Sequence, residues 1–316
     1  MNSTRKKILK TTLPLLLGGV LVWYSLAGMN QEKMITHLKN ANFEWVFLGL
    51  FFGVLSHLSR AYRWKFMLAP MGYKPKFVNS FLAVLIGYFV NLAIPRAGEV
   101  SRATVMVNYE NIPFQKGFGT IVAERIADMI MMFLIIGITL FFQFDYILAL
   151  VSENFDPIKI GFLLLGIISA ITVFTSFVKK AKQGFLLKIK NFILSLIEGV
   201  TSILKMEKKW DFIFHTFFIW TMYIAMFWAT IPAIQGLEVP VGGVLVGFIA
   251  GGFSIAATNG GIGSYPLAVM GAFLLFNVPE SPSEAFGWIM WSAQTLMIIV
   301  FGGLAFLVLP IYNKKK

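Results

Sequence analysis

The chain has 316 residues, 57% of them apolar, a mean hydropathy of +0.75 and a formal net charge of +12. The apolar content excludes a soluble globular protein and is typical of a polytopic membrane protein. The positive charge does not indicate nucleic-acid binding, because the basic residues flank apolar runs, where they orient a membrane protein.

The cysteine and histidine content limits the kinds of catalytic and metal sites that the chain can contain. The chain contains no cysteine, which excludes disulfides, thiolate catalysis and cysteine metal sites. Its histidines, His37, His57 and His215, lie far apart and lack metal-ligand spacing. We therefore predict neither a metal nor another cofactor.

Apolar runs close to the roughly 20 residues needed to cross about 30 Å of hydrocarbon predict the transmembrane helices. A long apolar part and the lack of a cleavage site favour an uncleaved first span over a signal peptide. We expect one integral-membrane domain, 1–316, whose two further apolar regions, about 78–110 and 241–277, are each interrupted by Pro or Gly. The expected spans are 8–28, 45–62, 119–143, 158–178, 211–234 and 286–309.

Charge decides how the two interrupted regions cross. Both termini, the loop 63–77 and the lysine-rich segment 179–209 are basic, whereas the loop 144–157 carries only acidic charges. The positive-inside rule then places the N- and C-termini in the cytoplasm and makes each interrupted region enter and return on one side. Charge does not distinguish a re-entrant hairpin from a spanning one, although polar residues in the second arm of the first hairpin favour a buried re-entrant arm.

A further segment, about 185–204, has polar residues at helical spacing along one stripe. We expect an interfacial amphipathic helix there; a seventh span is the alternative, but it would break the parity. The predicted fold class is thus an all-α polytopic membrane protein with about six transmembrane helices plus two oppositely oriented helical hairpins. Such paired interruptions indicate an inverted repeat with a central site.

The first hairpin contains the stretch NLAIPRAGEVSRA. Pro95 lacks an N–H and Gly98 tolerates unusual backbone angles, so the chain is expected to turn there. Charged residues within a membrane are costly and by default indicate a functional site. A guanidinium fork suits phosphate oxygens, and ion pairing that only locks helices together is the alternative. The candidate residues are Asn91, Pro95, Arg96, Gly98, Glu99 and Arg102.

A second charged group begins the next expected span. Glu124 and Asp128 are i,i+4 neighbours on one helix face, and Arg125 can reach Asp128 at i,i+3. These three residues are included in the predicted intramembrane polar site, either as part of it or as a structural ion pair.

A third charged group lies at the C-terminal end of the second expected span. Arg60, Arg63 and Lys65 are interpreted as topological residues whose side chains reach the cytoplasmic surface. His57 is interpreted as an interhelical hydrogen bonder. The alternative makes His57, Arg60 and Arg63 accessory site residues.

The second hairpin has glycines at every fourth position, at 243, 247 and 251, which favour close helix contact. A polar, glycine-rich break follows. It permits a tight turn, and it also leaves backbone N–H groups free to approach an anion. The candidate residues of this second hairpin are Thr258, Asn259, Gly260, Gly261 and Gly263, with Ser264 beside them.

Taken in chain order, these motifs resemble the lysylphosphatidylglycerol synthase transmembrane family, also called flippase-like or UPF0104 proteins. The resemblance covers nearly the whole chain, and its most specific part is Pro-Arg-x-Gly-Glu with the downstream Glu-Arg-x-x-Asp. The motifs are Arg60-x-x-Arg63-Trp64, Asn91-x-x-x-Pro95-Arg96-x-Gly98-Glu99-x-x-Arg102, Glu124-Arg125-x-x-Asp128 and Gly260-Gly261-Ile262-Gly263.

The resemblance implies a domain of a bacterial or archaeal plasma (inner) membrane. In the best-known members it moves aminoacylated phosphatidylglycerol between leaflets and is fused to a soluble aminoacyl-transferase domain. No such domain follows before Lys316, so we do not expect lysyl transfer. The sequence also departs from the family's usual pattern: Thr258-Asn259 stands where a proline-containing pair is common, and Pro266 stands where Glu or His is frequent. Because proline has no titratable side chain, the resemblance does not carry a proton or headgroup role to Pro266.

The leading hypothesis is therefore a non-enzymatic lipid transporter for an anionic phospholipid or lipid-linked headgroup, with membrane lipids as partners. Arg96 and Arg102 would hold phosphate, Glu99, Glu124 and Asp128 would orient them or bind a cationic headgroup, and the hairpins would form two gates. One alternative is an integral-membrane transferase acting on a lipid or a lipid-linked donor. The other is an accessory subunit of a separately encoded lipid-modifying enzyme.

Overall fold

The computed structural model describes residues 31–144 and 205–314, except Asn259, and isolated residues at 20, 146, 169, 183, 187 and 203. Every regular element among these residues is a helix, which confirms the all-α class. The predicted spans 8–28 and 158–178 and the amphipathic helix 185–204 lie almost entirely outside the described residues. The chain divides into two compact units, residues 1–124 with 210–316, and residues 125–209.

A long helix, two shorter helices separated by a turn, and another long helix follow one another twice in the described residues. The inverted repeat inferred from the sequence stays a prediction. The first set is α3 (Phe43–Leu68), α4 (Phe77–Ala93), α5 (Ala97–Glu110) and α6 (Phe114–Phe142), preceded by α2 (Gln31–Lys39). The second set is α10 (Lys209–Thr230), α11 (Val241–Ala257), α12 (Ser264–Leu274) and α13 (Glu280–Tyr312). Short 3-10 turns, η1 (Ala69–Met71) and η2 (Ile231–Ala233), follow α3 and α10.

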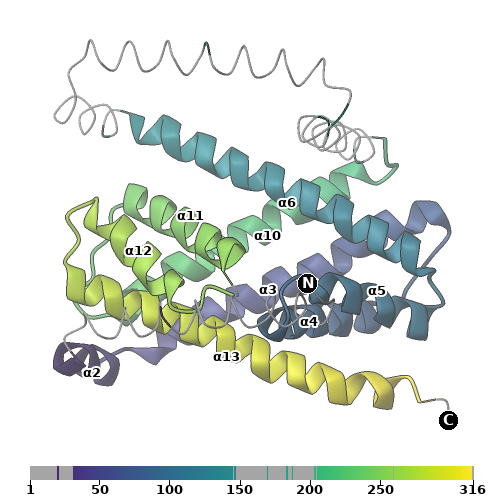
Figure 1. Ribbon diagram of the computed structural model, residues 1–316, viewed down its shortest axis with the longest axis horizontal. Helices are drawn as coiled ribbons and strands as arrows, with labels where there is room; N and C mark the ends of the chain where they lie inside the picture. The colour runs from purple at the N-terminus through teal and green to yellow at the C-terminus, as the bar shows by residue number, and fades with distance from the viewer. Residues whose placement is uncertain are drawn as a thin grey trace. The chain divides into compact units, whose positions relative to one another are not determined.

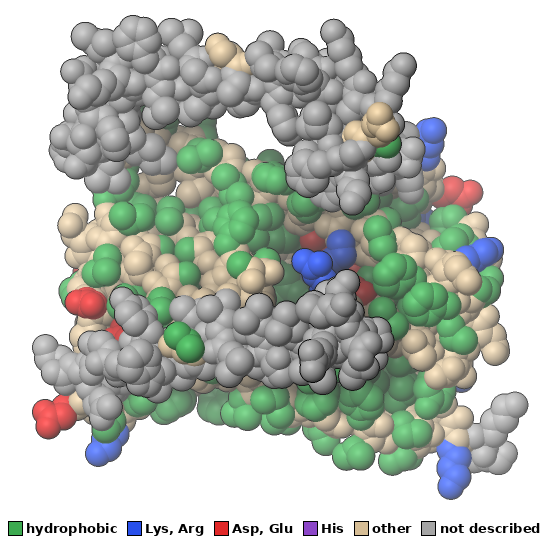
Figure 2. Space-filling model, in the orientation of Figure 1, with side chains coloured by type: hydrophobic (Ala, Val, Ile, Leu, Met, Phe, Trp, Pro, Cys, Tyr) green, Lys and Arg blue, Asp and Glu red, His purple; other side chains and the backbone are tan. Residues whose placement is uncertain are grey.

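Three of these helices are long and apolar enough to cross a membrane: Phe114–Phe142, Lys209–Ala233 and Glu280–Tyr312. They cover the spans predicted at 119–143, 211–234 and 286–309. The predicted span 45–62 lies within α3, whose 26 residues end in a basic segment. Large hydrophobic side chains are exposed along these helices, as Phe141 is to 78%, and Figure 2 shows hydrophobic side chains over much of one face. Together the helices indicate an integral membrane protein.

The helices α4 and α5 approach each other closely at two glycines. A β-carbon on Gly98, in the first turn of α5, would collide with the carbonyl oxygen of Gly87 and with the side chain of Asn91. The Asn91 Oδ1 accepts a hydrogen bond from the Gly98 amide at 2.7 Å. The chain reverses between the helices through Arg96, which has a left-handed φ of 65°.

The long helix α13 packs against one helix of each pair, α4 of the pair α4–α5 and α12 of the pair α11–α12 (Figure 1). One hydrophobic cluster joins α13, through Phe286 and Ile289, to α10 and α12. A second cluster joins α13, through Ala305 and Leu309, to α3, α4 and α5. Because burial of apolar surface is the main stabilising term, α13 is the common support of both pairs.

A polar network holds the C-terminal end of α13. The Asn79 Nδ2 donates to Glu110 Oε1 at 2.5 Å and to Asn313 Oδ1 at 2.9 Å, and Asn313 Nδ2 donates to Asn79 Oδ1 at 2.7 Å. The three side chains come from the start of α4, the last residue of α5 and the residue after α13. Asn79 is fully buried, so these hydrogen bonds replace those that water would make.

We expect the Gly98→Ala substitution to destabilise the protein by about 1–3 kcal/mol, because the added methyl meets backbone that cannot move aside without separating α4 from α5. The matched control is Gly119→Ala, where a β-carbon meets nothing within 4 Å and the helix gains up to about 1 kcal/mol. Thermal unfolding in detergent measures both. Equal unfolding temperatures for the two variants would show that the close contact is absent.

Candidate functional site

A buried ionic cluster lies where α3, α5 and α6 meet. The carboxylate of Glu124 on α6 accepts from Arg60 Nη1 at 2.5 Å and from Arg102 through two bonds of 3.2 Å. The Nη2 of Arg63 lies 3.5 Å from Glu124 Oε1. Arg102 is 3% exposed and the other three residues 2% or less. We name Arg60, Arg63, Arg102 and Glu124 the arginine–glutamate cluster.

Helix geometry and local packing fix the orientation of the three arginine side chains. Arg60 and Arg63 are three residues apart and therefore share one face of α3. The Arg63 Nη1 donates to Thr216 Oγ1 on α10 at 2.8 Å. The Arg102 guanidinium lies 4.4 Å from the centre of the Trp64 ring, whose Nε1 donates to Thr120 at 2.7 Å. Stacking on an aromatic face and bidentate pairing both restrict a guanidinium to one orientation.

The interpretation of Arg60 and Arg63 as residues that reach the cytoplasmic surface is wrong. Both are buried and contact Glu124, because their face of α3 is turned towards α6 and α10. Lys65 lies on another part of α3 and is partly exposed. Its Nζ lies 3.2 Å from the centre of the Tyr62 ring. The alternative that groups the two arginines with the polar site agrees with this geometry.

A chain of tyrosines connects the cluster to His57. The Arg60 Nη2 donates to Tyr223 OH at 3.4 Å, and Tyr223 OH lies 3.1 Å from Tyr88 OH. The Tyr88 ring centre is 4.6 Å from that of His57. His57 is 6% exposed, and its Nδ1 makes no hydrogen bond to the described part of the chain. The predicted interhelical hydrogen bond of His57 is therefore not found at that nitrogen.

The first turn places the remaining residues of its motif outside the cluster. Arg96 and Pro95 are exposed, and Glu99 is half-buried. The Asn91 Nδ2 donates to Glu99 Oε2 at 3.4 Å. Arg102 lies six residues beyond Arg96, about 9 Å along the axis of α5. The motif thus joins an exposed cation at the turn to a buried one in the cluster.

The second half of the Glu-Arg-x-x-Asp motif forms the pair that its spacing predicts. The Arg125 Nη1 lies 3.7 Å from Asp128 Oδ2, at i,i+3 along α6. The Arg125 side chain is 42% exposed. Glu124, in contrast, directs its carboxylate to arginines from α3 and α5.

The second turn lies between α11 and α12 and is rich in hydroxyl groups. The Ser264 Oγ lies 2.6 Å from Ser254 Oγ and 2.9 Å from Thr258 Oγ1, and the Gly261 amide donates to Thr258 Oγ1 at 3.1 Å. Gly260, Gly261 and Gly263 all have positive φ, which L-residues rarely adopt. These glycines therefore make the tight turn that the sequence permits; Asn259 lies outside the described residues.

The two turns lie next to each other. A β-carbon on Gly260 would lie 3.3 Å from Cδ2 of Leu92, which precedes Pro95 by three residues. The Gly260 carbonyl accepts a hydrogen bond from Trp291 Nε1 on α13 at 2.8 Å. Proximity of the two motifs does not follow from either one alone.

Several residues that hydrogen-bond within or around the site were not predicted from the sequence. They are Tyr88, Thr120, Thr216 and Tyr223. Their only sequence signal is a polar atom within an otherwise apolar helix. Within the described ranges no group of three His, Cys, Asp or Glu side chains could hold a metal ion. The chemistry that the described site offers is therefore that of guanidinium and carboxylate groups with neutral hydroxyls around them.

Comparison with known proteins gives a match over nearly the whole length. The family described as lysylphosphatidylglycerol synthase TM region matches residues 12–303. The UPF0104 membrane protein MJ1595 of Methanocaldococcus jannaschii is 25% identical in an alignment 348 positions long, which covers 98% of each chain.

Two further relatives match in part. The UPF0104 membrane protein PH1989 of Pyrococcus horikoshii is 26% identical over 172 residues, 53% of this chain and 47% of that protein. The glycosyltransferase AglD of Haloferax volcanii is 33% identical over 88 residues, 28% of this chain and 14% of that protein. No solved structure matches the chain significantly.

We expect Glu124→Gln to lower stability by about 3–5 kcal/mol, because the buried guanidiniums lose a charged partner. Glu99→Gln is the matched control, since Glu99 is half-buried at the turn and its loss should cost about 1 kcal/mol or less. Unfolding temperatures in detergent, with circular dichroism to confirm helix content, compare the two. A Glu124→Gln variant as stable as Glu99→Gln would contradict the arrangement of the cluster.

Proposed function

Because the chain belongs to the family of the lysylphosphatidylglycerol synthase TM region, we propose that it is a flippase-like membrane transporter. It moves an anionic phospholipid or a lipid-linked headgroup between the leaflets. We place it in the plasma membrane of a prokaryote, with both termini in the cytoplasm; the relatives named above are archaeal.

The observation that carries the proposal is the arginine–glutamate cluster, buried among helices of which α6 and α10 are apolar enough to span a bilayer. A headgroup that crosses about 30 Å of hydrocarbon loses its hydration, at a high cost in free energy. Fixed guanidiniums offset that cost, because their planar N–H fork pairs with two phosphate oxygens at once. The cluster thus supplies the polar surroundings that the bilayer lacks.

The motif at the first turn suggests the route of the headgroup. Arg96 is exposed at the N-terminus of α5, where the helix dipole also favours an anion. Arg102 lies farther along the same helix and is paired with Glu124. In this proposal phosphate is met by Arg96 and then competes with the Glu124 carboxylate for Arg102. Glu124 keeps Arg102 oriented while no headgroup is bound.

The adjacent turns support a role as gates. Leu92 and Gly260 lie in contact range. Each turn connects the two helices of a pair, and one helix of each pair packs on α13. Separation of the turns would admit a headgroup from one side, and their contact would exclude water from the other.

We expect Arg96→Gly to reduce leaflet transfer at least tenfold without loss of stability. Arg96 holds a left-handed backbone angle, which costs a non-glycine residue about 1–2 kcal/mol, so glycine removes the guanidinium and relieves strain together. Arg102→Lys, which keeps the charge but not the fork, should also reduce transfer. The assay is movement of labelled phosphatidylglycerol in vesicles containing the purified protein.

Lys74→Ala serves as the control, because Lys74 is an exposed cation in the connection before α4. Its transfer rate should equal that of the unaltered protein. If Arg96→Gly and Arg102→Lys transfer lipid at that same rate, the arginines do not handle the headgroup.

A second function is favoured by the partial similarity to the glycosyltransferase AglD. In that case the protein would be a transferase acting on a lipid-linked donor, with Glu99 as the general base. Incubation of the purified protein with a labelled lipid-linked sugar tests this function. Product formation that Glu99→Gln abolishes would establish it, and co-purification with a lipid synthase without intrinsic transport would instead indicate an accessory subunit.

A further inference from the structure

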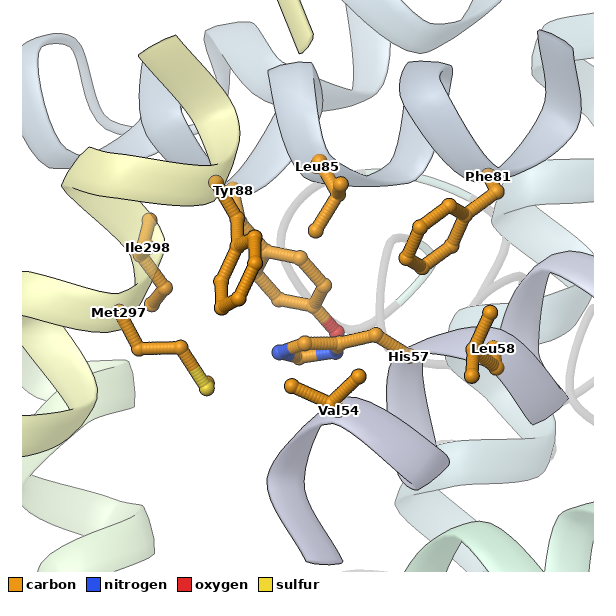
Figure 3. Close-up of a pocket in the computed structure, with 9 residues that line it drawn as sticks. Val54, His57, Leu58, Phe81, Leu85, Tyr88, Met297 and Ile298 are labelled. Atoms are coloured by element: carbon orange, nitrogen blue, oxygen red, sulfur yellow. The ribbon is translucent and has the colours of Figure 1, made fainter. Parts of the chain in front are cut away.

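A cavity of about 170 Å³ lies between α3, α4 and α13 (Figure 3). Each helix contributes side chains from one face. Its lining is hydrophobic apart from one histidine and one tyrosine. The lining residues are Val54, His57 and Leu58 of α3, Phe81, Leu85 and Tyr88 of α4, and Met297, Ile298 and Phe301 of α13.

The two polar residues of the lining, His57 and Tyr88, are neighbours and line the cavity through their rings. Figure 3 shows the rings of His57 and Tyr88 side by side, with Leu85 and Phe81 beyond them. The ring centres of His57 and Tyr88 are 4.6 Å apart. The buried Nδ1 of His57 has no hydrogen-bond partner in the described part of the chain. A buried polar atom of this kind is unusual in a protein interior and points to a partner outside the described residues.

His57 and Tyr88 also connect the cavity to the arginine–glutamate cluster. His57 and Arg60 are three residues apart on α3, about 4.5 Å along the helix axis. The Tyr88 hydroxyl contacts Tyr223, which accepts from Arg60. An apolar space and a charged site thus meet across the His57 and Tyr88 side chains. A molecule that occupies both needs a hydrocarbon part and an ionic part.

The apolar lining of the cavity favours binding of the hydrocarbon part of such a molecule over its ionic part. Buried water needs two to four polar partners, and an apolar cavity of about 150 Å³ stays dry but takes up a ring-sized hydrocarbon. No lysine, arginine, aspartate or glutamate lines this cavity, so it offers a charged headgroup no partner. Its volume suits a short stretch of hydrocarbon chain.

On the basis of the proposed function, we infer that the cavity binds a hydrocarbon chain of the lipid substrate. The chain segment nearest the headgroup lies among Leu85, Met297 and Ile298, beside the rings of His57 and Tyr88. The ionic part then lies towards Arg60 and the rest of the cluster. The substrate class is a lipid recognised by its chain as well as by its charge.

The test is photo-crosslinking of the full-length protein with phosphatidylglycerol that carries a diazirine in its chain near the headgroup. A straight acyl chain and a methyl-branched isoprenoid chain with the same headgroup form the two arms. Mass spectrometry then locates the labelled residues. We expect labelling of Leu85, Met297 or Ile298 in at least one arm. Labelling only at residues exposed to the bilayer, such as Phe133 or Leu296, would overturn the inference.

A matched pair of variants makes the test specific. Ile298→Phe places a ring in the cavity, whereas its neighbour Ile299 is 45% exposed and Ile299→Phe leaves the cavity open. We expect Ile298→Phe to lower labelling of Leu85 and Met297 at least tenfold, and Ile299→Phe to leave it unchanged. Equal labelling of the two variants would overturn the inference. Thermal unfolding establishes that each variant is folded. The location of labelled residues in the unaltered protein does not depend on the folding of either variant.

The readout also separates this inference from the proposed function. Cavity labelling in a protein that moves no lipid between leaflets would support the chain site and refute transport. Transport without cavity labelling would refute the chain site and leave the proposed function in place.

Discussion

The need to pair charge in an apolar interior dominates this structure. One carboxylate, Glu124, receives guanidiniums that lie 64 and 22 residues before it in the chain. An ion removed from water costs several kcal/mol unless its partner is held in good geometry. The helices α3, α5 and α6 are therefore constrained to meet at this carboxylate. Trp64 and Thr216 complete the constraint, because they orient Arg102 and Arg63 respectively.

The hydrophobic packing is organised around the same requirement. Two apolar clusters, one on each part of α13, hold the interrupted helix pairs against a single long helix. This arrangement brings the turn after Leu92 next to Gly260, although the two lie in opposite halves of the chain. A broken helix within an apolar protein frees backbone groups that need partners. Asn91 and Thr258 provide them, through bonds to the amides of Gly98 and Gly261.

Much of the helical framework could be predicted from the sequence, because helix length, apolar runs and the Pro95 and Gly260 breaks are local signals. The spans expected at 119–143, 211–234 and 286–309 each correspond to an observed helix, and the predicted family is confirmed. The local pair of Arg125 with Asp128 also followed from spacing.

What the sequence could not supply is tertiary pairing. Helical spacing relates Glu124 to Asp128 but carries no information about Arg60 on another helix. Basic residues at the end of a span satisfy the positive-inside rule whether they face water or a buried carboxylate, so the rule alone assigns Arg60 and Arg63 to the surface although both are buried. The cavity between α3, α4 and α13 could not be predicted either, since apart from His57 and Tyr88 its lining residues are ordinary apolar residues in each helix.

The network of Asn79, Glu110 and Asn313 has a mechanical consequence. It pins the far end of α13 to the first helix pair, while Trp291 bonds the near end to the second turn. A tilt of α13 would therefore move the base of the first helix pair and the second turn at the same time, so motions at the two proposed gates would be coupled through one helix.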